Sequence, residues 1–157
     1  MTSKRKSSRR GAVSVEFAFV APLFLIILVG VAQASRLLEA QNTLSSAAAE
    51  GGRIGATDRD VLPNDDETST NDLVEREVRR YLNTRGISAD NVTVKITPPG
   101  DTETILDLDN PANNNALFQV WVSIGFENLI STQFPGSDEY SLNSGAIFRN
   151  AVNYPDN

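Results

Sequence analysis

The chain is 157 residues long and acidic, with 14 Lys and Arg against 20 Asp and Glu, for a formal net charge of −6. It contains no cysteine and no histidine, which excludes disulfide bonds and thiolate chemistry and removes the commonest general base and metal ligand. Five of the basic residues precede Gly11, so the remainder holds 9 basic against 20 acidic residues, a balance that argues against binding nucleic acid.

An uncharged, apolar run extends from Phe17 to Ser35. At about 1.5 Å per helical residue, about 19 residues reach roughly 28 Å, close to the ~30 Å hydrocarbon core of a bilayer. The basic head before this run predicts that the N-terminus stays in the cytoplasm and that the rest of the chain lies on the far side of the inner membrane. The sequence therefore predicts one transmembrane helix over 12–35.

Three interpretations of this segment remain open. Ala32-Gln33-Ala34 fits the small-residue site of a secretory signal peptide, which would release a soluble binding protein after Ala34. A static bitopic anchor that displays a periplasmic domain is the second. The third is a pilin-type leader, cut on the cytoplasmic side of the apolar run. Gly11 and Glu16 favour the third, because a carboxylate in a membrane segment costs roughly 2–3 kcal/mol and tends to be functional.

The helical pattern continues past the apolar run. It predicts one helix from about Val13 to about Glu50, apolar all round in its first half and amphipathic in its second. Pro22 lacks a backbone donor and is expected to kink or loosen this helix near Ala18. One face of the second half carries Leu37, Leu44, Ala47, Ala48, Gly51, Ile54 and Gly55.

A motif covers the first third of the sequence: a basic leader ends at Gly11, a four-residue spacer follows, and Glu16-Phe17 comes next. The amphipathic half of the helix continues the pattern with Arg36, Leu37, Gln41, Leu44, Ala47, Ala48, Gly51 and Arg53. Together these residues resemble the N-terminus of TadE-like pseudopilins, minor components of the Tad (Flp) branch of type IV pilus systems.

This resemblance implies that a membrane-embedded prepilin peptidase cuts between Gly11 and Ala12. Glu16 then becomes the fifth residue of the mature chain and is expected to pair with the N-terminal amine of a neighbouring subunit, which would fix the register of packed helices. The alternative is that Glu16 merely snorkels to the interface. The implied partners are the peptidase, other pilin and pseudopilin subunits packed through their helices, and the inner membrane, with no nucleic acid.

Beyond residue 56 the sequence predicts a polar loop over 57–72 and a helix over 71–86. Thr70 or Asn71 is expected to cap this helix, and Gly86 to end it at the position after the C-cap. Its three arginines, Arg79, Arg80 and Arg85, are interpreted as dipole partners and a solvated face. Its apolar stripe is Val74, Val78, Tyr81 and Leu82.

Alternating apolar residues then predict strands at 92–96, 116–126 and about 140–148, a turn over 98–103 and a short edge strand over 104–109. The strongest strand places Phe118, Val120, Val122, Ile124 and Phe126 on one face, with Leu117 and Trp121 on the other. The closing strand is expected to use Tyr140, Leu142, Ala146 and Phe148. Trp121 is interpreted as packing, not as a ligand platform.

Asp107–Asn115 superficially suggests calcium, but it lacks the central Gly and terminal Glu of an EF-hand, and a solvated loop is expected. No nucleophile–base pair and no phosphate-cradling glycine loop occurs, so no enzymatic activity, catalytic residue, cofactor or metal is predicted.

The predicted organisation is a basic leader (1–11), a transmembrane helix (12–35), its amphipathic continuation (36–56) and an extracytoplasmic body (57–157). The fold class is α+β: a long N-terminal helix, one further helix and an antiparallel sheet of three or four strands on the distal half of the first helix. The comparison of this fold with pilins is an analogy.

Overall fold

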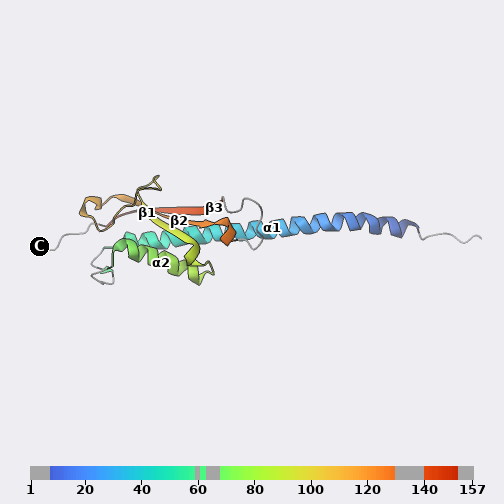
Figure 1. The fold of residues 1–157 in the computed structure, drawn as a ribbon, viewed down its shortest axis with the longest axis horizontal. Helices are drawn as coiled ribbons and strands as arrows, with labels where there is room; N and C mark the ends of the chain where they lie inside the picture. The colour runs from blue at the N-terminus through green and yellow to red at the C-terminus, as the bar shows by residue number, and fades with distance from the viewer. Residues whose placement is uncertain (1–7, 59–60, 63–67, 130–139, 152–157) are drawn as a thin grey trace, which may run out of the picture. The chain divides into compact units, whose positions relative to one another are not determined.

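The computed structural model describes residues 8–58, 61–62, 68–129 and 140–151 (Figure 1). It confirms the α+β class: a long apolar N-terminal helix, one further α-helix and a three-stranded antiparallel sheet. The chain divides into two compact units, 1–37 and 38–157. Helix α1 (Ser8–Gly55) supplies residues to both units, and everything that follows it belongs to the second.

Helix α1 is longer than predicted at both ends, since the expected range was Val13 to Glu50. It stays helical through Pro22, where the kink remains a prediction. Within the first unit its large apolar side chains are exposed; Phe17 is 71% and Phe19 80% exposed. In the part of the chain that the structure describes, α1 is the one helix long and apolar enough to cross a membrane, a test that a signal sequence also passes.

In the second unit, one face of α1 is buried in the body's core. Leu44, Ala47 and Ala48 are fully buried, and Gly51 and Gly55 lie on the same face, as the periodicity predicted. Ala40 and Gly52, which the predicted face left out, are buried too. The amphipathic half of α1 is therefore part of the folded body and not a spacer before it.

Close contacts explain why positions 51 and 52 of α1 are occupied by glycine. A Cβ on Gly51 would lie 2.4 Å from Val78 Cγ2, and a Cβ on Gly52 would lie 2.2 Å from the ring of Phe148. Glycine costs about 1 kcal/mol of helix propensity relative to alanine. Because glycine has no side chain, α1 approaches both the second helix and the sheet closely at these positions.

Replacing Gly52 with alanine is expected to lower the free energy of unfolding of the body. Overpacking against Phe148 costs about 1–3 kcal/mol, which offsets or exceeds the ~1 kcal/mol of helix propensity gained. Gly30→Ala is the matched control, because no atom lies within 4 Å of a Cβ built there. Chemical denaturation of the two full-length variants in detergent measures the difference. A Gly52→Ala body at least as stable as the wild type would contradict the packing described above.

Helix α2 (Thr70–Thr84) begins one residue after its cap. Ser69 is the N-cap, and its hydroxyl accepts a hydrogen bond from the Asp72 N–H at 3.1 Å, so the prediction of Thr70 or Asn71 was wrong. The predicted end is correct. Gly86 has φ +80°, and the Ile87 N–H donates to Leu82 O at 3.1 Å, which forms a Schellman motif. The buried stripe comprises Thr70, Leu73, Val74, Val78 and Leu82.

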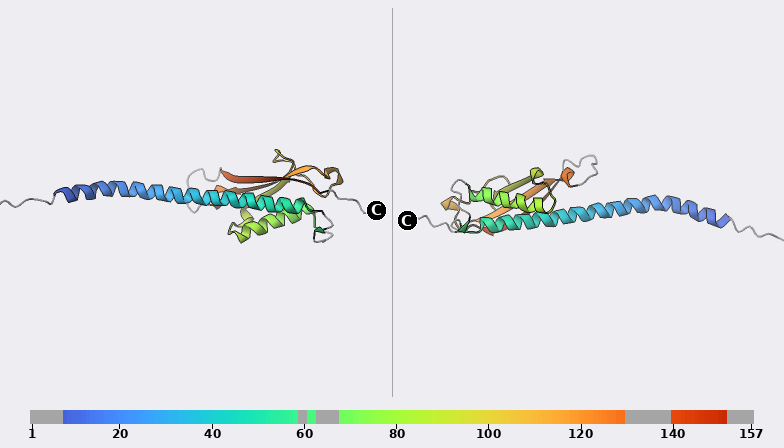
Figure 2. Two further views of the ribbon diagram at one scale, coloured as in Figure 1. Left: turned by 180° about the vertical axis from the view of Figure 1, so that it is seen from behind. Right: turned by 90° about the horizontal axis from the view of Figure 1, so that it is seen from below.

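The sheet has the order β1-β2-β3, built from Val92–Thr97, Leu117–Gly125 and Ser141–Arg149. Both pairings are antiparallel, with Val94 opposite Val122 and Val120 opposite Ala146. The predicted face of β2, from Phe118 to Ile124, is buried, and Leu117 is exposed on the other face. Ser123, which has the parity of Leu117, is buried as well, which the alternation did not predict. Within the second unit, α2 and the distal part of α1 lie side by side on the inner face of this sheet (Figure 2).

Two residues at the strand ends differ from the prediction. Phe126 lies outside β2, in a short 3-10 helix (η4, Phe126–Asn128). Tyr140 precedes β3 and is 62% exposed. The backbones still pair there, because the Phe126 N–H donates to Tyr140 O at 2.9 Å. At this end of the sheet, Phe126 and Tyr140 are therefore joined through their backbones.

The predicted edge strand over 104–109 does not form. One ladder-like hydrogen bond occurs, from the Leu106 N–H to Ile96 O at 2.8 Å. The segment instead bonds to α2: the Asn71 side chain donates to Leu106 O and accepts from the Leu108 N–H, at 2.8 and 3.1 Å. Leu106 is half-buried and Leu108 is buried, with Asp107 exposed between them, so the segment keeps its alternation. Its backbone bonds to the Asn71 side chain instead of forming a strand ladder.

Candidate functional site

The predicted processing segment lies in the first part of α1. Gly11 and Ala12 are within the helix, and Glu16 and Phe17 are exposed on it. Ala12 and Glu16 are four residues apart, about 6 Å along a helix axis and nearly one turn. A chain cut after Gly11 would therefore carry its new amine and its carboxylate on one helix face.

Glu16 is placed among apolar neighbours. Val15 and Phe19 are 58% and 80% exposed, and neither offers a hydrogen-bond donor. In lipid an ionised carboxylate in this position needs a cation, because desolvation of an unpaired charge is expensive.

The first part of the chain is similar to a known family. Residues 11–53 match the family model described as TadE-like protein. This TadE-like segment begins at Gly11, contains Glu16-Phe17 and confirms the resemblance noted from the sequence. It supports a Tad-pilus-related protein. No curated protein and no solved structure matches the chain.

The TadE-like segment reaches well into the body. Its residues from 38 onwards belong to the second compact unit, where Leu44, Ala47 and Ala48 are fully buried. At Gly51 and Gly52, near the end of the match, α2 and β3 lie in close contact with α1. The matched residues therefore include both the apolar run and the helix face that holds the body's core.

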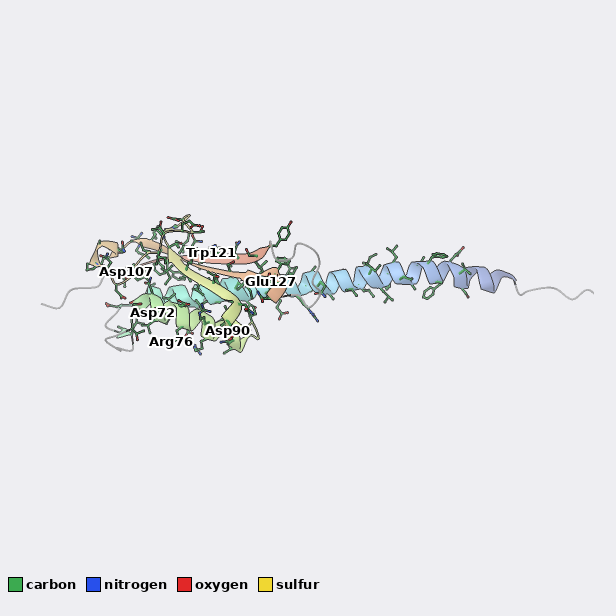
Figure 3. The ribbon with its side chains drawn as sticks, viewed as in Figure 1. Asp72, Arg76, Asp90, Asp107, Trp121 and Glu127 are labelled. Carbon is green, nitrogen blue, oxygen red and sulfur yellow. The ribbon has the colours of Figure 1, made fainter. Side chains whose placement is uncertain are left out.

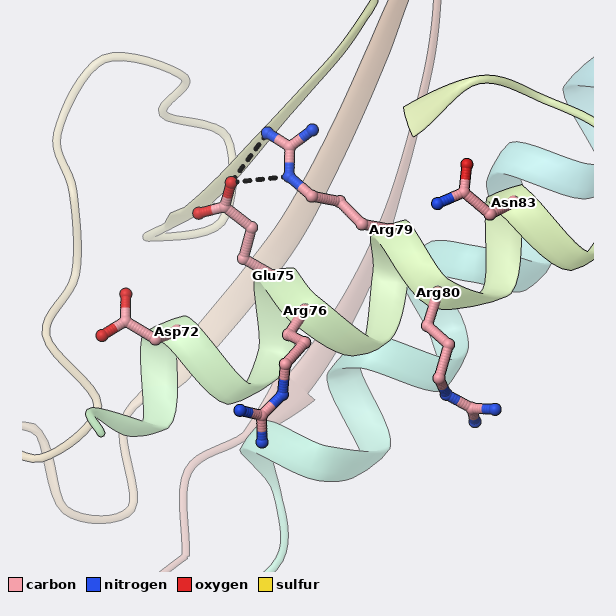
Figure 4. Close-up of a pocket in the computed structure, with 6 residues that line it drawn as sticks. All are labelled: Asp72, Glu75, Arg76, Arg79, Arg80 and Asn83. Atoms are coloured by element: carbon pink, nitrogen blue, oxygen red, sulfur yellow. Dashed lines mark hydrogen bonds and ion pairs between the residues drawn. The ribbon is translucent and has the colours of Figure 1, made fainter. Parts of the chain in front are cut away.

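A hollow of about 490 Å³ lies on the solvent side of α2 (Figure 4). Arg79 Nη2 lies 2.7 Å from Glu75 Oε1, and Arg79 also donates to Ala89 O. The hydrogen bonds that Glu77 accepts from Arg80 raise the pKa of that guanidinium further above its ordinary value. The hollow is lined by Asp72, Glu75, Arg76, Arg79, Arg80 and Asn83.

These contacts revise the interpretation of the arginines. Arg79 and Arg80 pair with acids one turn earlier on α2, and the last turn of the helix holds no basic residue. Arg85 is the C-cap, and its guanidinium lies 5.3 Å from the centroid of the Tyr81 ring. The solvated face is as predicted, while the contacts that hold the side chains are local pairs.

The acidic loop at 107–115 uses its polar groups internally. Asp109 accepts from the Thr70 N–H at 2.7 Å and from the Thr70 hydroxyl, and Asp107 accepts from the Asp109 N–H at 3.0 Å. Among the residues with described placement, no group of three acidic, His or Cys side chains could hold a metal ion. The loop therefore anchors the start of α2, a role that the sequence pattern did not indicate. Another acidic stretch of the sequence, Asp65–Glu67, lies outside the described residues.

A second acidic loop follows β1. Asp101 accepts from the backbone N–H groups of Glu103 and Thr104, at 2.7 and 3.2 Å. These bonds, that of Glu103 first, lower the pKa of the Asp101 carboxyl. Gly100 has φ +82°, and the Asp101 N–H donates to Pro98 O at 3.1 Å, so the predicted turn is present.

Trp121 lies on the outer face of the sheet, as its strand parity predicted (Figure 3). It is half-buried there, opposite Lys95 on β1 and Gly145 on β3, and it is not a member of the core cluster. Its position between paired residues of both neighbouring strands agrees with a packing role.

Proposed function

We propose that the protein is a minor pilin-like subunit, a pseudopilin, of a Tad/Flp-type pilus system. The observation that carries this proposal is the TadE-like match over residues 11–53, which joins Gly11, Glu16 and the amphipathic helix in one segment. The subunit helps build or prime a pilus that serves adhesion or secretion. In this role it is the substrate of a peptidase and performs no catalysis.

In this proposal the precursor is anchored in the bacterial inner membrane. Residues 1–11 lie in the cytoplasm, residues 12–35 span the bilayer, 36–56 continue the helix, and the 57–157 body is periplasmic or extracellular. A prepilin peptidase cuts between Gly11 and Ala12. The exposed apolar side chains of α1 then pack against other pilin and pseudopilin helices, and small residues allow close approach.

Glu16 supplies the register of that packing. Its carboxylate pairs with the Ala12 amine of a neighbouring subunit, because two opposite charges in a low dielectric are tolerable together and costly apart. One buried polar pair among apolar contacts favours a single axial position of one helix against the next.

The alternative of secretion after Ala34 requires a cut inside α1. This helix is continuous from Ser8 to Gly55, so that cut would divide it between the apolar run and the face buried in the body. A static bitopic anchor requires no cut. In neither alternative does a prepilin peptidase remove the residues before Ala12.

Co-expression with and without a prepilin peptidase tests the proposal. With the enzyme, intact-mass measurement of the membrane-fraction protein is expected to show loss of residues 1–11; without it, the precursor is expected to keep them. A Gly11→Val variant co-expressed with the enzyme is the matched control and is expected to remain full-length. Equal masses with and without the peptidase would exclude the processing step.

A further inference from the structure

The hollow on α2 presents an unpaired cation. Arg76 is exposed, and within the described ranges no carboxylate pairs with it and no acceptor hydrogen-bonds its side chain. Arg80, although paired with Glu77, keeps 67% of its side chain exposed. Figure 4 shows these two guanidinium groups pointing to the same side of α2, away from the Glu75–Arg79 pair. The lining holds three arginines against the two carboxylates of Asp72 and Glu75, so its net positive charge suits an anionic group.

The loop between β1 and β2 presents the complementary charge. Glu103 is exposed, and no partner contacts its carboxylate in the described part of the chain. The loop around it is fixed: Lys95 Nζ donates to Thr102 O at 3.1 Å, and the Gly100 N–H donates to Gln119 Oε1 at 3.2 Å. A loop backbone held in this way loses little conformational entropy on binding.

These two surfaces lie on opposite sides of the body. In Figure 1, and in the view from behind in Figure 2, the loop after β1 projects from the sheet side, while α2 lies on the side of the helices. One body therefore does not satisfy its own Arg76 with its own Glu103. Two such surfaces on one body fit a head-to-tail contact, which repeats from copy to copy instead of closing a two-fold dimer.

We propose that the α2 hollow of one copy binds the 98–105 loop of a second copy, with Glu103 pairing with Arg76. The occupant is a second copy because this chain supplies both charges in exposed, unpaired positions. Exposed ion pairs are weak, so the contact forms appreciably where membrane anchoring raises the effective concentration of the bodies. The contact joins the bodies and does not require leader removal, so it differs from helix packing through Glu16.

Thiol crosslinking in membranes tests the contact, because the wild-type chain has no cysteine. Two differently tagged full-length copies carry Asp72→Cys, at the hollow, and Thr102→Cys, on the loop; both sites are exposed. A short bis-maleimide is used, since an Arg–Glu pair separates Cα atoms beyond the ~4.4–6.8 Å of a disulfide. The control pair replaces Asp72→Cys with Thr93→Cys, an exposed site on β1.

The hollow–loop pair is expected to crosslink at least about fivefold more than the control pair. Adding Arg76→Glu to the Asp72→Cys copy should lower the yield about fivefold, and adding Glu103→Arg to the other copy should restore it. Arg76 has no described partner, so its reversal is expected to leave the fold intact. Yields equal to the control, or unaffected by either reversal, would overturn the proposal; intact-mass analysis of the leader reports separately on the proposed function.

Discussion

Replacing Glu16 with glutamine is expected to reduce recovery of the subunit in sheared pilus fibres by at least about tenfold. Glutamine keeps the size of the side chain and removes its charge, so the neighbouring subunit's amine is left unpaired in a low dielectric. Breaking a buried ion pair typically costs about 3–5 kcal/mol, and a tenfold loss corresponds to only ~1.4 kcal/mol. Quantitative immunoblotting of fibres against the membrane fraction measures the ratio.

Glu39→Gln is the matched control for Glu16→Gln. Glu39 is an exposed acid on the same helix, beyond the uncharged run, and its replacement is expected to leave fibre recovery unchanged. If Glu16 only snorkelled to the interface, both variants would behave alike. Normal maturation together with normal fibre recovery in Glu16→Gln would reject its role in assembly.

Phe118→Ala is expected to lower the free energy of unfolding of the body by about 3–5 kcal/mol, because it opens a cavity at a fully buried site. Phe118 packs against Phe148, with ring centroids 6.2 Å apart, and it lies beneath Gly55 of α1. A loss of this size is a large share of the ~5–15 kcal/mol that stabilises a typical domain. Denaturation followed by fluorescence of Trp121, the single tryptophan, measures it on the same strand.

Leu117→Ala is the control for this core variant. Leu117 is next to Phe118 on β2 but 48% exposed on the outer face, so its truncation is expected to cost less than about 1 kcal/mol. The two variants differ by strand parity alone. Equal losses would show that the sheet buries both faces or that its register differs from the one described.

Hydrophobic periodicity predicted the buried face of those elements whose apolar residues recur at helical or strand spacing. The face of α1 from Leu44 to Gly55 has helical spacing, and the apolar residues of β2 alternate from Phe118 to Ile124, so the repeat identified the buried face of each element. Ser123, on the other face of β2, is also buried, and the repeat did not indicate it. Ala40 and Gly52 fit the same spacing, four residues from Leu44 and Ala48. They were missed because small residues carry a weak hydrophobic signal, although Gly52 lies in close contact with Phe148 of β3.

Features that depend on distant residues were not predictable. The 104–109 segment has the composition of a strand, but the Asn71 side chain, 35 residues away from Leu106, bonds its backbone instead. Asp109 likewise serves Thr70 across the fold. Ser69 became the cap in place of two equally suitable neighbours, a choice within the ordinary uncertainty of a helix boundary.

The candidate functional residues likewise include some that the sequence predicted and some that it did not. Gly11, Ala12, Glu16 and Phe17 came from a resemblance to a family, and the TadE-like match over residues 11–53 covers all four. The hollow on α2 was not foreseen, because the sequence shows the arginines but not which of them are already paired. Only the fold shows that Glu75 and Glu77 satisfy Arg79 and Arg80 and leave Arg76 without a described partner.

The identity of the mature N-terminal residue, read by sequencing protein purified from cells that contain the pilus system, tests the central claim most directly. Processing by a prepilin peptidase predicts Ala12 as that residue. Ser35 would instead indicate a secreted protein released from a signal peptide, and an intact Met1 would indicate a static anchor; either result would contradict a subunit that presents a new amine beside Glu16.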